Sequence, residues 1–236
     1  MKQEVYLKSP LEEILWLLPD QGAFKLGPHS LKKSKIQDPP APYYVNLRNL
    51  RSYPETVRKM AEVFGNFIHS RAVFDKIVDV PTAATPFVSA LSVTKSWPMI
   101  SPRMDKKEYG SGQKIDGVYE IGERVVVIDD VLTNGESKLE SIKILEAEHL
   151  FVRDIVVFLD RLEGGTVELE KAGYRVHSLC TIDDLIGLLS RTGRITDDIV
   201  EIISMYRSGN IRYNWPNSES NFIYQIKPAS EFITRT

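Results

Sequence analysis

The sequence has few of the residues that support disulfide, metal or hydrolytic chemistry. It contains one cysteine, Cys180, and four histidines among 236 residues. A single cysteine excludes an internal disulfide, which fits a reducing compartment, so a cytoplasmic protein is expected. The histidines do not stand at metal-ligand spacing, and the GxSxG motif of serine hydrolases is missing. A Ser/His/Asp hydrolase and a histidine-based metal site are therefore disfavoured.

Long apolar runs and a strong excess of one charge are also missing. There is no uninterrupted stretch of about 18 apolar residues, and Met1 is not followed by a signal-peptide core. The 30 basic and 32 acidic residues leave a net charge of -2, which gives no support for nucleic-acid binding. We therefore expect neither a membrane nor a nucleic acid as a partner.

What the sequence does have is one strongly patterned stretch, residues 125–137. Its first four residues, Val125–Ile128, are typical of a strand covered on both faces in a parallel sheet. Two carboxylates, Asp129 and Asp130, come next, followed by a short turn of hydroxyl, amide and glycine residues. From Ser137 onward, apolar residues recur at helical spacing. Open parallel sheets bind ligands at such a junction of strand, turn and helix.

The residue types at this junction suit a phosphorylated sugar. A turn that opens a helix offers free N–H groups and a positive dipole end to a phosphate. Thr133 and Ser137 add hydroxyl donors, and Gly135 allows close approach of the main chain. Because Asp129 and Asp130 would repel a phosphate, they are expected to face ribose hydroxyls or a magnesium ion. A ribose 5-phosphate satisfies this pattern, whereas the Walker and GxGxxG motifs are missing. The alternative is that this junction binds no ligand and is an ordinary turn between a strand and a helix, with two acidic residues at its rim.

Strands and helices alternate along most of the remaining sequence, which predicts a mostly parallel sheet with right-handed crossovers. The other expected strands are residues 43–47, 76–80, 98–100, 155–159 and 174–179. The expected helices are residues 11–18, 55–70, 87–94, 166–172 and 196–206, with two more beginning near 137 and 181. One domain is predicted over residues 1–209, with a hood at about 1–50 and a core at about 51–209. Residues 210–236 read as a polar tail with no assigned role.

Four segments of this chain resemble the orotate phosphoribosyltransferase family, including the corresponding half of UMP synthases. They are the phosphoribosyl-pyrophosphate (PRPP) motif at 125–137, the basic loop at 103–112, the segment 159–165, and the hood segment 22–34 with Pro42–Tyr44. The resemblance covers roughly residues 10–208. It implies an α/β type I phosphoribosyltransferase fold, with a central, mostly parallel sheet flanked by helices and an N-terminal hood subdomain.

The resemblance also implies roles for individual residues. The residues implied in catalysis are Arg103, Lys107, Asp129 and Asp130. Those implied in binding PRPP are Lys32, Arg103, Lys106, Lys107, Tyr109, Asp129, Asp130, Val131, Leu132, Thr133, Asn134, Gly135, Glu136 and Ser137. Those implied in binding orotate are Lys32, Tyr43, Tyr44, Thr133 and Arg161. The chain departs from many family members by having Met104 and Tyr109 in the loop, and Ala83 where some members carry a lysine.

Plainer interpretations of the charged residues stay open at this point. The basic residues of the 103–112 loop could be a solvated charge run, and Lys32 could be a surface lysine beside Lys33. Arg161 could form a salt bridge with Asp160 or Glu163 rather than pair with a carboxylate of a ligand.

The activity implied is transfer of ribose 5-phosphate from PRPP to orotate, which yields orotidine 5-monophosphate and pyrophosphate. Mg²⁺ is the expected cofactor, bound mainly through PRPP rather than by protein ligands. A homodimer is expected, with the 103–112 loop acting at the neighbouring site. Two alternatives remain: a phosphoribosyltransferase for another base, and a PRPP-binding regulator without turnover.

Overall fold

The computed structural model describes residues 3–29, 41–104, 113–209 and 225–235. The chain divides into two compact units. The core unit comprises residues 50–182, and the terminal unit combines residues 1–49 with residues 183–236. In the described part of the chain, no helix is both long and apolar enough to cross a membrane.

The core unit is built around a six-stranded sheet in the order β6-β5-β4-β7-β8-β9. Its strands are β4 (Lys76–Asp79), β5 (Met99–Pro102), β6 (Ile115–Asp116), β7 (Arg124–Leu132), β8 (Phe151–Asp160) and β9 (Arg175–Thr181). Its helices are α2 (Pro54–Arg71), α3 (Thr85–Lys95), α4 (Glu136–Ala147) and α5 (Gly165–Lys171). Neighbouring strands are parallel except β5 and β6. The predicted α/β fold with a mostly parallel central sheet is confirmed.

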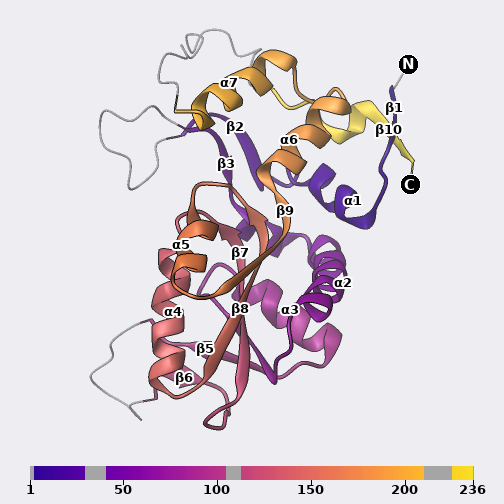
Figure 1. The fold of residues 1–236 in the computed structure, drawn as a ribbon. Coiled ribbons are helices and arrows are strands. Elements are labelled where there is room, and N and C mark those ends of the chain that lie inside the picture. The colour runs from indigo at the N-terminus through magenta and orange to yellow at the C-terminus, as the bar shows by residue number, and fades with distance from the viewer. Residues whose placement is uncertain (1–2, 30–40, 105–112, 210–224, 236) are drawn as a thin grey trace. The chain divides into compact units, whose positions relative to one another are not determined.

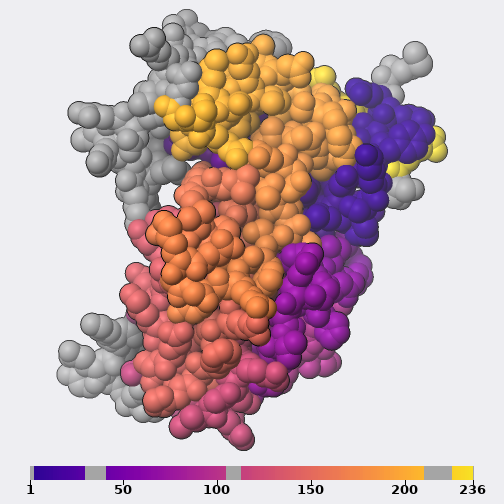
Figure 2. Space-filling view, in the orientation of Figure 1, coloured from indigo at the N-terminus to yellow at the C-terminus, as the bar shows by residue number. Residues whose placement is uncertain are grey.

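Helices cover both faces of this sheet, with α2 and α3 on one side and α4 and α5 on the other (Figure 1). Successive side chains of β8 point to opposite faces of the sheet, so this strand packs against helices on both sides. Val157 packs in the cluster that includes Ile142 and Leu145 of α4, whereas Phe158 meets Phe64 of α2 edge-on at 5.9 Å between ring centroids. In the space-filling view, orange residues of α5 and β9 lie on the visible surface, as expected where β9 ends the sheet (Figure 2).

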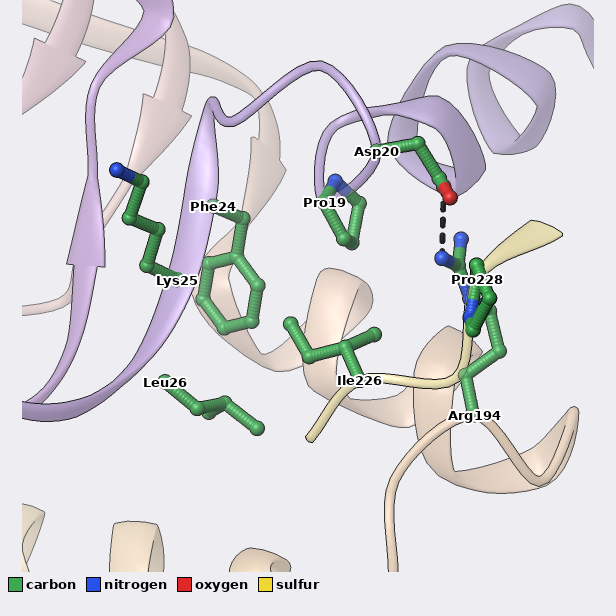
Figure 3. A pocket seen from close by; sticks show the side chains of 8 residues that line it. All are labelled: Pro19, Asp20, Phe24, Lys25, Leu26, Arg194, Ile226 and Pro228. Atoms are coloured by element: carbon green, nitrogen blue, oxygen red, sulfur yellow. Dashed lines mark hydrogen bonds and ion pairs between the residues drawn. The ribbon is translucent and has the colours of Figure 1, made fainter. Parts of the chain in front are cut away.

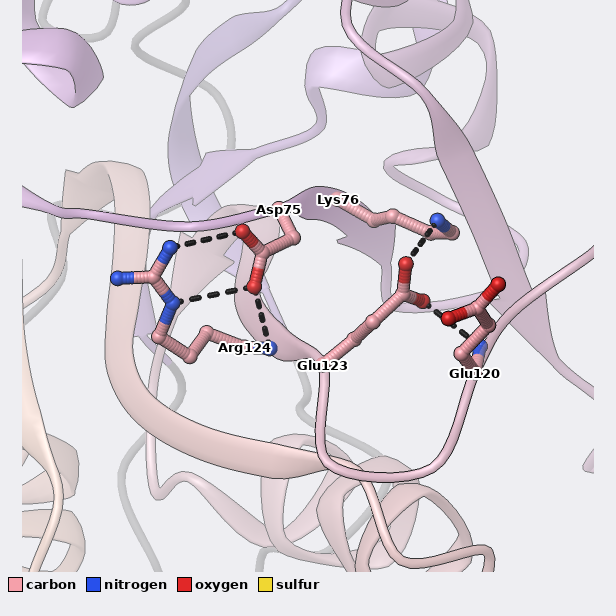
Figure 4. A network of polar contacts seen from close by, with 5 residues as sticks. All are labelled: Asp75, Lys76, Glu120, Glu123 and Arg124. Carbon is pink, nitrogen blue, oxygen red and sulfur yellow. Dashed lines mark hydrogen bonds and ion pairs between the residues drawn. The ribbon is translucent and has the colours of Figure 1, made fainter.

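A network of exposed and partly buried ion pairs joins the beginnings of β4 and β7 (Figure 4). Arg124 donates to both carboxylate oxygens of Asp75, at 3.0 and 2.7 Å, and its main-chain N–H also donates to Asp75 at 2.9 Å. Lys76 pairs with Glu123 at 2.6 Å, and Glu123 accepts from the main chain of Glu120 at 2.9 Å. These contacts fix the register of the two central strands at the edge where the strands begin.

The terminal unit contains two small sheets and three helices within the described residues. Its elements are β1 (Gln3–Tyr6), α1 (Pro10–Leu17), β2 (Phe24–His29), β3 (Ala41–Val45), α6 (Ile182–Arg191), α7 (Asp197–Arg207) and β10 (Phe232–Arg235). Short 3-10 helices lie at Leu47–Ser52 and Ala229–Glu231. β2 and β3 pair antiparallel, and β1 pairs in parallel with β10, so the two ends of the chain share one sheet.

Arg194 ties the C-terminal segment to the beginning of the chain. Its guanidinium is buried, donates to the main-chain carbonyls of Trp16 and of Lys227, and pairs with Asp20 at 2.7 Å. It also lies over the Trp16 ring at 4.6 Å from the centroid. Figure 3 shows the Asp20–Arg194 pair beside an open pocket. The remaining residues that line this pocket are Pro19, Phe24, Lys25, Leu26, Ile226 and Pro228.

The structure differs from the sequence prediction in four details. Strand β7 does not end before the acidic pair but continues to Leu132, because the chain keeps pairing with β8 as far as Asp160. Residues 183–209, expected in the core, group with the terminal unit. The tail also contributes there through β10, whose Phe232 packs edge-on against Trp16 at 5.3 Å. Strands β1, β6 and β10 were not predicted, because two to four residues carry too little pattern.

Replacing Arg194 by alanine should destabilise the chain strongly, because two main-chain carbonyls would lose a donor and Asp20 would lose its counter-ion. Asp20 is 28% exposed and keeps the Ala229 N–H as a donor, so the loss should be at or below the value of about 3–5 kcal/mol that breaking a fully buried ion pair costs. Arg191→Ala is the control, because Arg191 is 38% exposed and pairs with Glu12, and such pairs contribute at most about 1 kcal/mol. Urea denaturation of both variants measures the difference, and equal losses would contradict the role given to Arg194.

Candidate active site

Two adjacent carboxylates occupy the end of β7, at the carboxyl edge of the sheet. Asp129 is 3% exposed and Asp130 is 8% exposed. The main-chain N–H of Asp130 donates to Asp129 Oδ1 at 2.8 Å, and the N–H of Val131 donates to Asp130 Oδ1 at 2.8 Å. Each carboxylate is thus fixed by the next peptide group, so the strand itself sets the direction of both side chains.

Lys138, in the first turn of α4, supplies the positive charge of the site. Its ammonium group forms an ion pair with Asp129 and donates to the Val131 carbonyl at 2.6 Å. The side chain is 3% exposed. Sequence reasoning missed this residue, although a signal exists. Lys138 stands four residues before Ile142 and seven before Leu145, so it occupies a position of the apolar stripe of the helix.

Burial raises the pKa of the Asp130 carboxyl above its ordinary value. The negative charge of Asp129 and a hydrogen bond with it raise the pKa further, while Lys138 and the Val131 N–H act in the opposite direction. The acid pair therefore retains a proton more readily than two exposed aspartates would. A ligand that offers hydroxyl donors to the pair is favoured, because each donor helps to stabilise the second negative charge.

The turn between β7 and α4 is held against the beginning of α5. Gly135 precedes α4 with φ 81°, a left-handed conformation that favours glycine. The N–H of Gly165 donates to the Thr133 carbonyl at 2.9 Å. A Cβ at Gly165 would lie 2.3 Å from that oxygen, so only glycine permits the approach. Thr133 is partly exposed and Ser137 is exposed at the beginning of the helix, where hydroxyl donors can meet a phosphate.

Arg161 follows β8 and lies beside the end of β7. Its main-chain N–H donates to the Leu132 carbonyl at 3.0 Å, and its guanidinium pairs with Glu163 at 2.6 Å. Asp160 has other donors, since it accepts from the Leu162 N–H and from the Thr166 hydroxyl at 2.7 Å each. The sequence alternative of a salt bridge with Glu163 is confirmed. Arg161 is 5% exposed, and its role in orotate binding stays a prediction.

The other residues named from the sequence are distributed more widely. Arg103 follows β5 and pairs through its guanidinium with Asp116 of β6. Its neighbour Met104 accepts a hydrogen bond from Ser141 of α4 at 3.7 Å to sulfur. Tyr43 and Tyr44 belong to β3 of the terminal unit. Lys32, Lys106, Lys107 and Tyr109 lie outside the described residues.

Comparison with known proteins gives the family. No protein-family model matches the chain. The chain is 36% identical over 177 residues to orotate phosphoribosyltransferase of Methanopyrus kandleri, which covers 75% of this chain and 92% of the relative. It is 31% identical over 205 residues to the orotate phosphoribosyltransferase of Caenorhabditis elegans, covering 85% and 88% respectively. The chain belongs to the orotate phosphoribosyltransferase family.

Longer relatives and solved structures agree with membership of the orotate phosphoribosyltransferase family. The chain matches Leishmania donovani UMP synthase with a TM-score of 0.72 and 32% identity, over 82% of this chain and 42% of that one. The fold matches Aeropyrum pernix orotate phosphoribosyltransferase with a TM-score of 0.63 at 24% identity, over 76% and 98%. The chain is 35% identical to the Nostoc bifunctional enzyme PyrF/PyrE over 66% of its length, and spans only 33% of that relative. The structural neighbours confirm the type I phosphoribosyltransferase fold.

Asp130→Asn should stabilise the fold, and increasingly so as the pH rises. Because the pKa of Asp130 is raised on folding, the folded chain keeps a proton that the unfolded chain releases, and wild-type stability falls as pH rises toward the raised pKa. Asparagine keeps the acceptor for the Val131 N–H without the charge. Thermal melts should place Asp130→Asn about 2–4 °C or more above wild type at pH 8, with little difference near pH 4. Exposed Glu140→Gln on α4 is the control, and a pH-independent difference would contradict the assignment.

Proposed function

We propose that the chain is an orotate phosphoribosyltransferase enzyme that transfers ribose 5-phosphate from PRPP to orotate. The products are orotidine 5-monophosphate, the immediate precursor in UMP synthesis, and pyrophosphate. The observation that carries the proposal is the acidic pair Asp129–Asp130 at the β7–α4 junction. The adjoining turn and Arg161, at the end of the neighbouring strand, lie beside this pair. Family membership supports the choice of orotate as the base.

Each described part of the site has a role in this reaction. Asp129 and Asp130 accept hydrogen bonds from the two ribose hydroxyls and orient the sugar. Thr133 and Ser137, with the main chain at the start of α4, bind the 5-phosphate. The transition state at ribose C1 resembles an oxocarbenium ion, so catalysis depends on position and electrostatics rather than on a protein nucleophile. Arg161 suits the carboxylate of orotate, because a guanidinium can donate two parallel hydrogen bonds to it.

Magnesium is proposed to reach the site bound to PRPP. Among the described residues no group of three or more histidine, cysteine or acidic side chains could hold a metal ion. Asp129 already has Lys138 as its counter-ion, which makes it a poor lone ligand. The ion neutralises charge on the leaving pyrophosphate when it is bound. That the metal is held mainly by substrate oxygens was the expectation from the sequence, and it stays a proposal.

The 103–112 loop is proposed to act at the site of a neighbouring subunit in a homodimer. Arg103 and Lys107 supply positive charge to the pyrophosphate when the loop closes, and Lys106 and Tyr109 complete the contacts of the loop with PRPP. Closure excludes water, which would otherwise hydrolyse the donor. The roles of Lys32, Tyr43 and Tyr44 in binding orotate stay predictions from the sequence. The cytoplasmic location stays a prediction from the sequence.

Two alternatives make different predictions. A phosphoribosyltransferase for uracil or a purine would use the same acidic pair but would not need a guanidinium for a carboxylated base. A regulator without turnover would bind PRPP and leave every base unchanged. The departures at Met104 and Ala83 are the features that favour the regulator, whereas Arg161 favours orotate.

The ultraviolet absorbance of orotate should decline when the chain, PRPP and magnesium are combined. Omitting PRPP, or removing magnesium with a chelator, should abolish the change. Uracil, adenine and hypoxanthine should remain unchanged in parallel reactions, because none carries a carboxylate for Arg161. Turnover of one of these bases in place of orotate would contradict the proposed substrate, and turnover of no base despite PRPP binding would favour the regulator.

Mixing two inactive variants tests the shared site. Lys107→Ala and Asp129→Asn should each lose most activity, because one removes the loop charge and the other a ribose contact. If the loop serves the neighbouring subunit, each mixed dimer contains one intact site, and random exchange restores about 25% of wild-type activity. Activity is measured after subunit exchange, with molecular mass determined by light scattering. A mixture that stays inactive, or a fully active monomer, would contradict the shared site.

A further inference from the structure

Lys138 occupies a position that ordinary helix energetics disfavour. It lies in the first turn of α4, where the helix dipole favours anions rather than cations. It is almost completely buried, and it shares the apolar stripe with Ile142 and Leu145. An aliphatic side chain would suit this position better on grounds of packing and charge. Exceptions of this kind concentrate at functional sites.

Both polar contacts of the Lys138 side chain are made with the end of β7. Its ammonium group meets the Asp129 carboxylate and the Val131 carbonyl, both at the end of β7. The side chain therefore ties the first turn of α4, where the proposed phosphate site begins, to the first acid of the ribose site. The Lys138 and Asp129 side chains are 4% and 5% exposed, so little solvent screening weakens the pair.

Stability alone is a weak reason for such a pair. Replacing a buried ion pair with well-packed apolar residues is often neutral or stabilising, because desolvation of two charges offsets their attraction. Without Lys138, however, the two adjacent buried carboxylates would face an anionic ligand without the cation that now pairs with Asp129. Burial, and then the charge of Asp129, already raise the pKa of Asp130 in the presence of the lysine.

We propose that Lys138 is a positioning residue for PRPP. It holds the Asp129 carboxylate in place for the ribose hydroxyls and offsets the repulsion between the acidic pair and the anionic ligand. This inference rests on the proposed function in taking PRPP as the ligand. Lys138 acts through Asp129 and does not itself touch the reacting atoms.

A double-mutant cycle on PRPP affinity tests this directly. The variants are Lys138→Met, Asp129→Asn and the double variant, with affinity for PRPP in magnesium buffer measured by titration calorimetry. Lys138→Met alone should weaken binding about ten-fold or more, the scale of one charge-assisted contact. In the Asp129→Asn background the same change should matter less than about two-fold, because the residue through which Lys138 acts has lost its charge.

Three further measurements separate positioning from a role in folding. Lys143→Met removes an exposed lysine of the same helix and should leave affinity unchanged. Lys138→Arg keeps the charge and should recover part of the lost affinity. The double variant removes both members of the Lys138–Asp129 pair, so neither stays buried without its partner. If Lys138→Met alone unfolds, Lys138→Arg provides the comparison in both Asp129 backgrounds. Melting temperatures of all variants show whether affinity losses follow unfolding.

The outcomes are decisive in either direction. Equal loss of PRPP affinity from Lys138→Met in both backgrounds would overturn the proposal, as would a loss that tracks melting temperature across the variants. If wild type binds PRPP but turns over no orotate, only the proposed activity fails, and the cycle still decides the role of Lys138. If wild type binds no PRPP, both proposals fail together.

Discussion

Repulsion between two adjacent buried carboxylates is the constraint around which the core unit is arranged. Asp129 and Asp130 follow directly on a run of buried β-branched residues, so both charges enter a region shielded from water. Two peptide N–H groups and Lys138 are the compensations that the chain provides. Burial, and then the charge of Asp129, still leave the pKa of Asp130 raised, which means that ionising both acids at once stays unfavourable. Hydroxyl groups of a ligand would donate hydrogen bonds to the two acids and stabilise their ionised forms. The uncompensated acids therefore favour ligands that carry hydroxyl donors.

Charged residues differ in their environment at the two ends of the central strands. Where β4 and β7 begin, Asp75 and Arg124 form a bidentate pair in contact with solvent, and such pairs serve mainly to fix register. Where β7 ends, the charges are buried and their geometry is rigid. Exposed ion pairs can be rearranged at little cost in free energy, whereas a buried carboxylate needs hydrogen-bond donors or a counter-ion in fixed positions. Substitutions of charged residues should therefore cost less at the amino ends of these strands than at the carboxyl ends, where the side-chain geometry is fixed. This agrees with ligand binding at the carboxyl ends of parallel strands.

The sequence predicted the parts of the fold that long local patterns encode. The run Val125–Ile128, the acids and the glycine turn located the junction, because each residue type has a strong local preference. Lys138 was missed because a lysine among apolar positions looks like surface until the helix is placed against β7. The pairing of β1 with β10 was missed for a similar reason, since residues 3–6 and 232–235 meet only through contacts distant in sequence. Local patterns specify elements, but the partner of a buried charge is set by tertiary packing.

Arg103, which is proposed to meet the pyrophosphate, is paired and yet accessible to solvent. Its guanidinium forms an ion pair with Asp116, and the two side chains are 45% and 56% exposed. Such a pair is strongly screened, so a pyrophosphate with several negative charges can compete for the guanidinium. The Lys138–Asp129 pair cannot exchange in this way, because breaking it would strand a buried charge. The structure therefore contains two kinds of paired cation: Arg103 in an exposed, exchangeable pair and Lys138 in a buried, fixed one. Under the proposed function, the first is available to the leaving pyrophosphate and the second holds an acid that orients the sugar.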